Sequence, residues 1–329
     1  MRHLTPTRFW LLLGAVMAAL PWLYSSDVYR HLLIITCFHA ILALSLNLVT
    51  GFTGQLSLGH SAFVAAGAYT SALLTLSGAS FWTGALAAGV VAFLLGLLVG
   101  LPSLRLQGIY LGMVTWGLAE IVRLTALNLD ITRGPMGLPG IPAISVFGTP
   151  LFKLWQIYYV VGGLLFLCII GTTRLVDSRI GDALLAIRED GLAAGAMGIN
   201  TLYYKVLIFG VSATVAGVAG AFYGSYLTFI SPQAFDVNMS ILILMMVVVG
   251  GLGSIPGSLL GAVILTLLPE AFRFLSDYRL WFYGAILIFM MIFRPQGILG
   301  AYRHLLPRLV LPAALTGAKG GGDHAARRA

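Results

Sequence analysis

The chain alternates long apolar runs with short polar connections. Most of the runs hold about 20 residues, the length with which an α-helix crosses a bilayer. A helix satisfies its backbone hydrogen bonds internally, so it is the structure that such a run adopts in lipid. The pattern therefore predicts an all-α, polytopic integral membrane protein with roughly nine or ten hydrophobic segments, some of them broken or re-entrant. The runs cover residues 9–24, 31–50, 61–76, 81–101, 109–129, 155–173, 206–229, 239–268 and 280–293.

The run at residues 239–268 is too long for one simple span. As a single helix its 30 residues would extend about 45 Å, whereas the hydrocarbon core of a bilayer is about 30 Å thick. Near its middle, the sequence GGLGSIPG begins at Gly250 and brings together residues that interrupt helices. We expect a break around Gly250 and Gly253, which leaves either two short helices or a re-entrant pair.

An earlier segment resembles this break. The sequence LVTGFTGQLSLG from Leu48 and the sequence VVVGGLGSIPG from Val247 both place G-x-x-G at the end of an apolar run. Gly51 and Gly54 then correspond to Gly250 and Gly253. Hydrophobic segments interrupted by glycine in two halves of a chain indicate a transport path. Close packing of helices through small residues explains the same pattern, and the two explanations are compatible.

One long polar stretch, residues 174–205, separates the apolar runs and also has a helical pattern. It holds eight of the thirty Asp, Glu, Lys and Arg residues. Apolar side chains recur along it at helical spacing, at Ile180, Ala183, Leu184 and Ile187. We therefore expect a short amphipathic helix on which Asp182, Arg188 and Glu189 face away from the apolar side.

A second short helix should follow directly. Asp190 can cap the backbone amides of residues 192–197, because an aspartate carboxylate accepts hydrogen bonds from the first turn of a helix. Gly198 can then end this helix in a left-handed conformation, which glycine adopts without steric cost. The polar stretch is thus predicted to fold as helix, turn and short helix.

Composition and charge agree with a membrane protein. The chain is 59% hydrophobic and 9% charged, whereas a soluble domain has roughly 25% charged residues. The net charge of +8 does not indicate nucleic-acid binding, because the basic residues are spread over short connections and the C-terminal tail. Cys37 and Cys168 each lie inside an apolar run, so the sequence supports neither a disulfide framework nor a metal site.

Loop charge sets the expected orientation. Six of the apolar runs precede Arg174, so the N-terminus and the polar stretch should lie on the same side as Arg105, the cytoplasmic side. The turn-rich loop at residues 128–153 should be external. We expect residues 9–24 to be a retained signal anchor, residues 1–313 to form the transmembrane domain, and residues 314–329 to be a disordered cytoplasmic tail.

Few residues suggest chemistry. Glu120 and Arg123 lie three residues apart inside the run at 109–129, where an unpaired charge costs at least about 2.5 kcal/mol. They are predicted to form an intramembrane ion pair, either as a structural link or in contact with a substrate. The sequence contains no catalytic constellation, no metal-ligand spacing and no phosphate-binding G-x-x-x-x-G-K-[ST] motif.

Several stretches resemble permease subunits of branched-chain amino acid ABC transporters. They span nearly the whole chain in order, and the likeness is closer to the LivM-type subunit than to the LivH-type. They include LSLNLVTGFTGQLSLGHSAFVAAGAYTSALL from Leu44, LRLQGIYLGMVTWGLAEIVRL from Leu104, TRGPMGLPGIP from Thr132, LLAIREDGLAAGAMGIN from Leu184, ILILMMVVVGGLGSIPGSLLGAVIL from Ile241 and FRPQGILG from Phe293.

The resemblance implies a multi-pass permease of the bacterial inner membrane. It implies import of branched-chain or other apolar amino acids and partnership with a LivH-type second permease subunit. It also implies two separate ATPase subunits, which carry ATP and Mg²⁺, and a periplasmic substrate-binding protein. No cofactor is then expected on this chain, which would be a non-catalytic subunit.

The resemblance further implies where the ATPases dock. ABC permeases carry an E-A-A-x-x-x-G coupling motif, and this chain retains Ala193, Ala194 and Gly198 of that pattern. Leu192 occupies the acidic position. Glu189 and Asp190 are the candidates to supply the missing charge. Because of this departure from the family pattern, coupling to the ATPase is not assigned to one acidic residue.

Other functions compete with this hypothesis. Related permeases that carry urea, short amides or aromatic acids have similar sequences. The sequence therefore does not identify the transported substrate. An ion-coupled secondary carrier would need ionisable groups around a central cavity and would not need a docking loop. An integral membrane enzyme would need clustered His, Asp, Glu or Cys residues at catalytic spacing, and the sequence lacks such a cluster.

Overall fold

The computed structural model describes residues 26–102, 106, 108–146 and 149–271, with scattered positions between 284 and 299. The predicted anchor at residues 9–24, Arg105 and the tail at 314–329 lie outside the described residues. The same holds for most of the run at 280–293.

The predicted membrane helices are confirmed in the described part of the chain. Five helices there are long and apolar enough to cross a membrane, α2 with its continuation to Gly51 and also α4, α5, α6 and α9. Their bounds lie close to those of the predicted runs, and the largest difference is at α9, which begins at Thr201 instead of residue 206. The helices are α2 (Asp27–Leu46), α3 (His60–Leu76), α4 (Phe81–Gly100), α5 (Ile109–Asn128), α6 (Leu154–Val176) and α9 (Thr201–Leu227).

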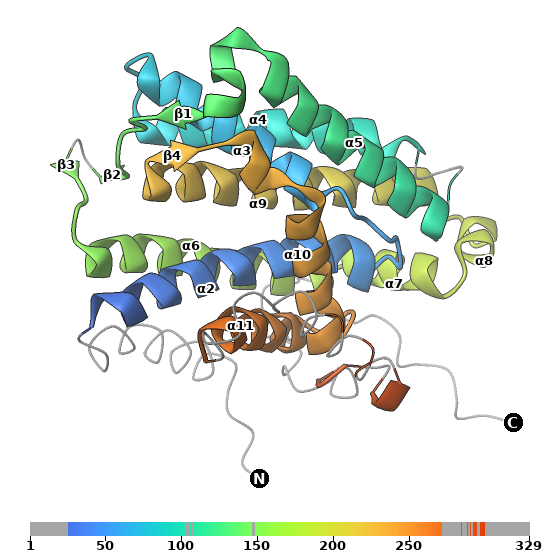
Figure 1. Cartoon of the computed structure of the whole chain (residues 1–329). Helices are drawn as coiled ribbons and strands as arrows, with labels where there is room; N and C mark the ends of the chain where they lie inside the picture. The colour runs from blue at the N-terminus through green and yellow to red at the C-terminus, as the bar shows by residue number, and fades with distance from the viewer. Residues whose placement is uncertain are drawn as a thin grey trace, which may run out of the picture.

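The long run at residues 239–268 is broken as expected. It forms α10 (Val237–Gly250) and α11 (Ile255–Ala271), which pack against each other. Between them Gly251 and Gly253 have φ angles of +127° and +76°, conformations that only glycine adopts easily. In Figure 1, α10 runs across the direction of α2, and α11 then turns back along α2.

A second break follows α2. The helix passes into a π-helical turn, η1 (Asn47–Gly51), and the chain then runs without regular structure to α3 at His60. The glycine pattern predicts an interruption here, but it does not predict the wider π-helical winding. Such turns occur frequently at functional sites. Both predicted breaks therefore exist in the fold.

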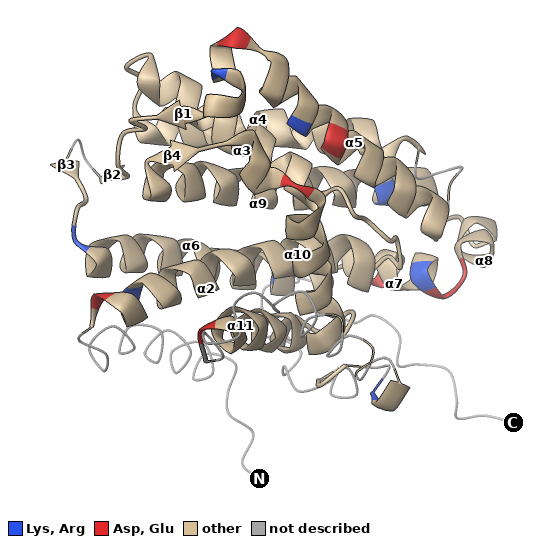
Figure 2. Cartoon of the chain, viewed as in Figure 1, with Lys and Arg blue, Asp and Glu red and all other residues tan. Residues whose placement is uncertain are grey.

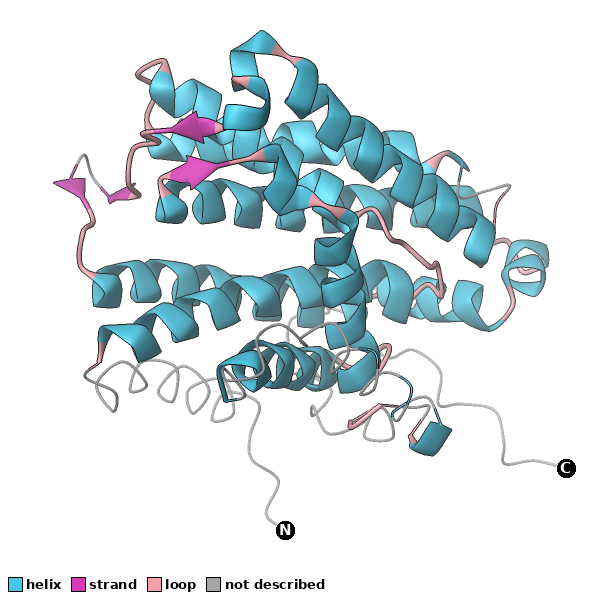
Figure 3. Ribbon diagram, in the orientation of Figure 1, coloured by secondary structure: helices cyan, strands magenta, loops and turns pink. Residues whose placement is uncertain are grey.

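The polar stretch forms the predicted pair of helices. These are α7 (Arg179–Glu189) and α8 (Gly191–Ala196), and they lie at one end of the bundle (Figure 1). Short turns and strands lie at the opposite end (Figure 3). They comprise η3 (Asp130–Thr132), η4 (Gly134–Met136), β1 (Leu138–Pro139), β2 (Ser145–Val146), β3 (Thr149–Pro150), β4 (Phe229–Ile230) and η5 (Pro232–Phe235).

Two antiparallel strand pairs stabilise that end of the bundle. Strand β1 pairs with β4, and Leu138 lies opposite Ile230. Strand β2 pairs with β3 in a short hairpin. The first pair joins the loop after α5 to the chain that leaves α9, so a connection from the first half of the protein is fixed to the segment that leads into α10.

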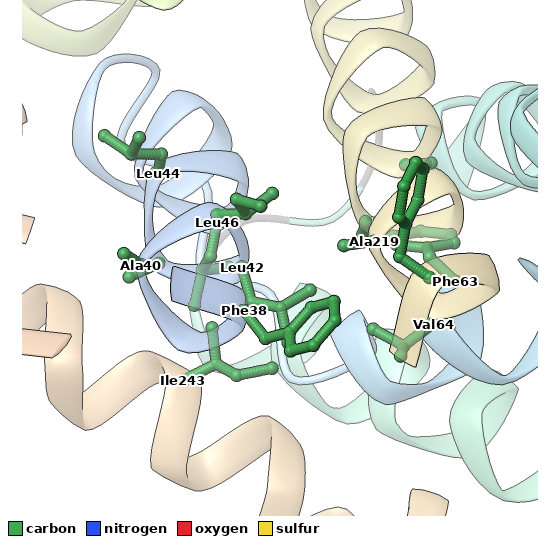
Figure 4. Close-up of a cluster of buried hydrophobic side chains, with 14 of the residues drawn as sticks. Phe38, Ala40, Leu42, Leu44, Leu46, Phe63, Val64, Ala219 and Ile243 are labelled. Carbon is green, nitrogen blue, oxygen red and sulfur yellow. The ribbon is translucent and has the colours of Figure 1, made fainter. Parts of the chain in front are cut away.

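The core lies where α2 meets α3, α9 and α10. Phe38 of α2 lies between Ile243 of α10 and Val64 of α3 (Figure 4), and each of these side chains is almost completely buried. Small residues allow α3 and α9 to approach closely. A Cβ atom on Gly67 would collide with the backbone of Gly217, so the two helices touch through their main chains.

Replacing Gly67 with Ala should lower the thermal unfolding midpoint of the purified protein, because the added methyl group must push α3 away from α9. Overpacking of this kind costs about 1–3 kcal/mol, which exceeds the gain in helix propensity of about 1 kcal/mol. Gly163→Ala in α6 is the matched control, since a Cβ atom there meets nothing within 4 Å. Equal midpoints for the two variants would contradict the close packing of α3 on α9.

Candidate functional site

The two helix breaks meet inside the protein. The side-chain oxygen of buried Asn47 accepts a hydrogen bond from the backbone N–H of Gly253 at 2.8 Å. The side-chain nitrogen of Asn47 donates to the carbonyl of Ser254 at 3.2 Å. A Cβ atom on Gly253 would lie 3.1 Å from the carbonyl oxygen of Gly51, so the two segments are in contact. The side chain of Asn47, at the end of α2, therefore provides hydrogen-bond partners for two backbone groups of the break between α10 and α11.

The four predicted glycines have separate places in this contact. Gly51 lies against Gly253 and Asn47. Gly250 packs on the backbone of Gly257, where a Cβ atom would collide. Gly54, with a φ angle of +70°, faces the side chain of Arg188 instead. The two glycine pairs thus mark two segments that touch each other, although Gly51 contacts Gly253 and not its counterpart Gly250.

Arg188 connects the polar helices to the first break. Its Nη1 donates a hydrogen bond of 2.6 Å to the carbonyl of Gly51, at the end of the π-helical turn. The prediction that Arg188 faces away from the bundle is therefore wrong. Its position borders the buried face of α7, and its long side chain reaches a carbonyl that stands at the end of η1, where regular helical hydrogen bonding stops. Asp182 and Glu189 are exposed, as predicted.

The turn between α7 and α8 has the predicted cap. The Asp190 carboxylate accepts hydrogen bonds from the backbone N–H groups of Leu192 at 2.8 Å and Ala193 at 3.0 Å. Gly198 follows the end of α8 with a φ angle of +87°. The cap and the glycine fix the direction of α8 relative to α7. Both capping bonds go to one carboxylate oxygen of Asp190, so this residue acts as a helix cap within the loop.

The exposed face of α8 is apolar. Leu192 is 88% exposed and Met197 is 84% exposed, and Ala193 lies on the same open surface. Ala194 is buried against the rest of the chain. The two alanines of the expected docking motif therefore point to different surroundings. Contiguous exposed apolar surface marks a candidate site for binding another protein.

A buried polar network holds the start of α3. The Nε2 atom of His60 lies 2.9 Å from the hydroxyl of Ser45 on α2 and 3.2 Å from the hydroxyl of Ser212 on α9. The backbone N–H of Ser61 donates to the hydroxyl of Ser240 on α10 at 2.9 Å. The first amides of a helix have no partner within it, and here neighbouring helices help to satisfy them. The sequence analysis missed this network because its members come from four separate runs.

Glu120 and Arg123 form a bidentate ion pair on α5. The Nε atom of Arg123 donates to one carboxylate oxygen at 2.9 Å, and Nη2 donates to the other at 2.5 Å. The side chains are 40% and 22% exposed, respectively. Figure 2 shows most charged positions at the ends of the bundle and this acidic and basic pair together on α5. The pair neutralises itself within a segment long and apolar enough to span a membrane.

Comparison with known proteins gives one consistent family. The family described as the permease component of branched-chain amino acid transport systems matches residues 29–293. The LivM permease proteins of high-affinity branched-chain amino acid transport in Salmonella typhimurium and Escherichia coli are each 37% identical, over 80% of this chain and 68% of theirs. The LivH permease protein of Escherichia coli is 36% identical over 41% of this chain and 44% of its own. No solved structure matches the chain.

Asn47→Ala should lower the thermal unfolding midpoint, because it leaves the N–H of Gly253 and the carbonyl of Ser254 without their partner. A buried polar group left unpaired costs about 1–3 kcal/mol. The matched control is Asn128→Ala, since Asn128 is exposed and bonds only to a carbonyl of its own helix. A midpoint for Asn47→Ala no lower than that of the control would contradict the role of Asn47 as the link between the breaks.

Proposed function

Because the chain belongs to the family of branched-chain amino acid transport permeases, we propose that it is the membrane subunit of an ATP-driven importer. In this proposal it moves branched-chain or other apolar amino acids across the bacterial inner membrane. ATP is hydrolysed on two separate ATPase subunits. This chain provides the path for the amino acid and the surface on which the ATPases dock, so that ATP hydrolysis drives transport.

The hydrogen bond from Arg188 to Gly51 carries the mechanistic part of this proposal. Arg188 lies on α7, next to the exposed apolar face of α8. Gly51 lies at the contact between the two breaks. A partner that moves α8 and α7 would therefore act on the broken helices through contacts that include this charge-assisted hydrogen bond. Such bonds are stronger than neutral ones.

The remaining subunits follow from the same assignment. The likeness to LivH proteins supports a second permease subunit of related fold as the partner within the membrane. A periplasmic binding protein would deliver the amino acid to the end that carries the β strands. That end lies opposite α7 and α8 (Figure 1), in agreement with an external loop at residues 128–153 and a cytoplasmic polar stretch.

The docking residues can be named more narrowly from the surface. Leu192, Ala193 and Met197 present the apolar area that an ATPase groove would cover. Ala194 supports this surface from within the chain. Asp190 and Gly198 hold the short helix at its angle, and Glu189 adds an exposed charge beside it.

Met197→Glu should weaken co-purification with the ATPase subunits by about tenfold or more, because a charge replaces an apolar contact at the centre of the docking surface. Met136→Glu is the matched control. Met136 is 83% exposed, close to the 84% of Met197, but it lies at the opposite end of the bundle. Both variants should insert in the membrane at normal yield. Equal retention of the ATPases by the two variants would contradict docking at α8.

A further inference from the structure

A cavity of about 490 Å³ opens between α2, α9 and the start of α10. Its volume lies within the range of about 300–1,000 Å³ that is usual for small-molecule sites. Figure 4 shows Phe38 and Leu42 on the α2 side, across from Val64 and Ala219. Leu242 and Met245 of α10 complete an apolar wall. The cavity opens to the surface beside the exposed residues Ala234, Asn238 and Ile241, and none of its lining residues belongs to α7 or α8.

One carboxylate lines this apolar cavity. Asp236 caps α10 by accepting a hydrogen bond of 3.1 Å from the backbone N–H of Met239. Its other oxygen accepts a bond of 2.5 Å from the side-chain amide of Asn238, which lines the cavity as well. A carboxylate offers about four lone-pair sites, so these two bonds leave acceptor capacity free.

The charge of Asp236 lacks a dedicated counter-ion within the described part of the chain. There, Arg30 pairs with Asp27, and Arg123 pairs with Glu120. Arg123 also attracts Asp236 electrostatically, but both of its carboxylate contacts go to Glu120. The side chains of Glu120, Arg123 and Asp236 together therefore carry a net charge of −1. A net negative charge beside an apolar cavity in a membrane protein favours a cation.

We propose that this cavity binds the transported amino acid during its passage, with the substrate ammonium group at Asp236. The apolar side chain of the substrate would lie against Phe38, Leu42, Leu242 and Met245. The free N–H of the Asn238 amide suits the substrate carboxylate. The ligand class is thus a small zwitterion with an apolar side chain. This inference rests on the proposed import function and adds the residues that contact the substrate.

Asp236→Asn tests the charge of Asp236 separately from its role as the cap of α10. Asn is as good a helix cap as Asp, so Asp236→Asn removes the charge and keeps the start of α10. In proteoliposomes that contain the complete transporter, leucine uptake by Asp236→Asn should fall by about tenfold or more, the usual effect of losing a hydrogen bond to a charged group. Asp182→Asn, at an exposed carboxylate in the first turn of α7, should leave uptake unchanged.

A binding measurement gives a second readout that does not depend on uptake. In a complex that carries Cys37→Ala and Cys168→Ala, Leu242→Cys supplies a single thiol in the cavity wall of this chain. Leucine should slow its reaction with a small methanethiosulfonate reagent, and Asp236→Asn should abolish that protection. D-mannitol, which lacks an ammonium group, should not protect.

The outcomes distinguish this inference from the proposed function. Failure of the wild-type complex to import any apolar amino acid would overturn the proposed function and this inference with it. Wild-type import combined with normal uptake by Asp236→Asn and no protection by leucine would overturn the inference alone. Loss of the second permease subunit from the Asp236→Asn complex would assign Asp236 to a subunit contact and would also overturn it.

Discussion

The satisfaction of backbone polar groups at two interrupted helices determines how this protein is built. A continuous helix meets the requirement by itself, but a break inside a bilayer leaves N–H and carbonyl groups that water cannot reach. Here the groups are paired across the two breaks. Asn47 bonds to Gly253 and Ser254, two consecutive residues of the turn before α11, and Arg188 bonds to the carbonyl of Gly51. The breaks are therefore stable only while α2, α7 and the α10–α11 turn stay together.

The two breaks connect the proposed docking surface with the proposed substrate cavity. The second break separates α10 from α11, and α10 lines the cavity at Asp236, Leu242 and Met245. The first break is bonded to α7, which continues through a capped turn into the exposed face of α8. One set of contacts thus runs from the surface proposed for the ATPases to the cavity proposed for the amino acid. It consists of packed helices and hydrogen bonds, and in the proposed mechanism movement at one end changes the geometry at the other.

The features that depend on local pattern could be predicted from the sequence. Apolar runs of membrane length located the long helices, and the glycines from Gly250 located the break. The repeat of the apolar positions located α7, and Asp190 located its boundary with α8. The features that depend on distant segments could not be predicted. Asn47 and Gly253 are 206 residues apart, and a single asparagine in an apolar run gives no sign of its partner.

Arg188 shows the same limit on a smaller scale. The helical pattern placed it on the polar side of α7, because a charged residue at that position is usually solvated. Its long side chain instead bends to a backbone carbonyl 137 residues away in the sequence. The cavity beside Asp236 is also a product of tertiary packing, since α2, α3, α9 and α10 each contribute to it.

The ratio of amino acid imported to ATP hydrolysed tests the link between α7 and the breaks most directly. Arg188→Ala removes the bond to Gly51, and Arg179→Ala removes an exposed arginine from the same helix as a control. With the assembled transporter in proteoliposomes, Arg188→Ala should retain its ATPases and hydrolyse ATP, while the ratio falls by about tenfold or more. Arg179→Ala should keep the wild-type ratio. An unchanged ratio for Arg188→Ala would contradict the account.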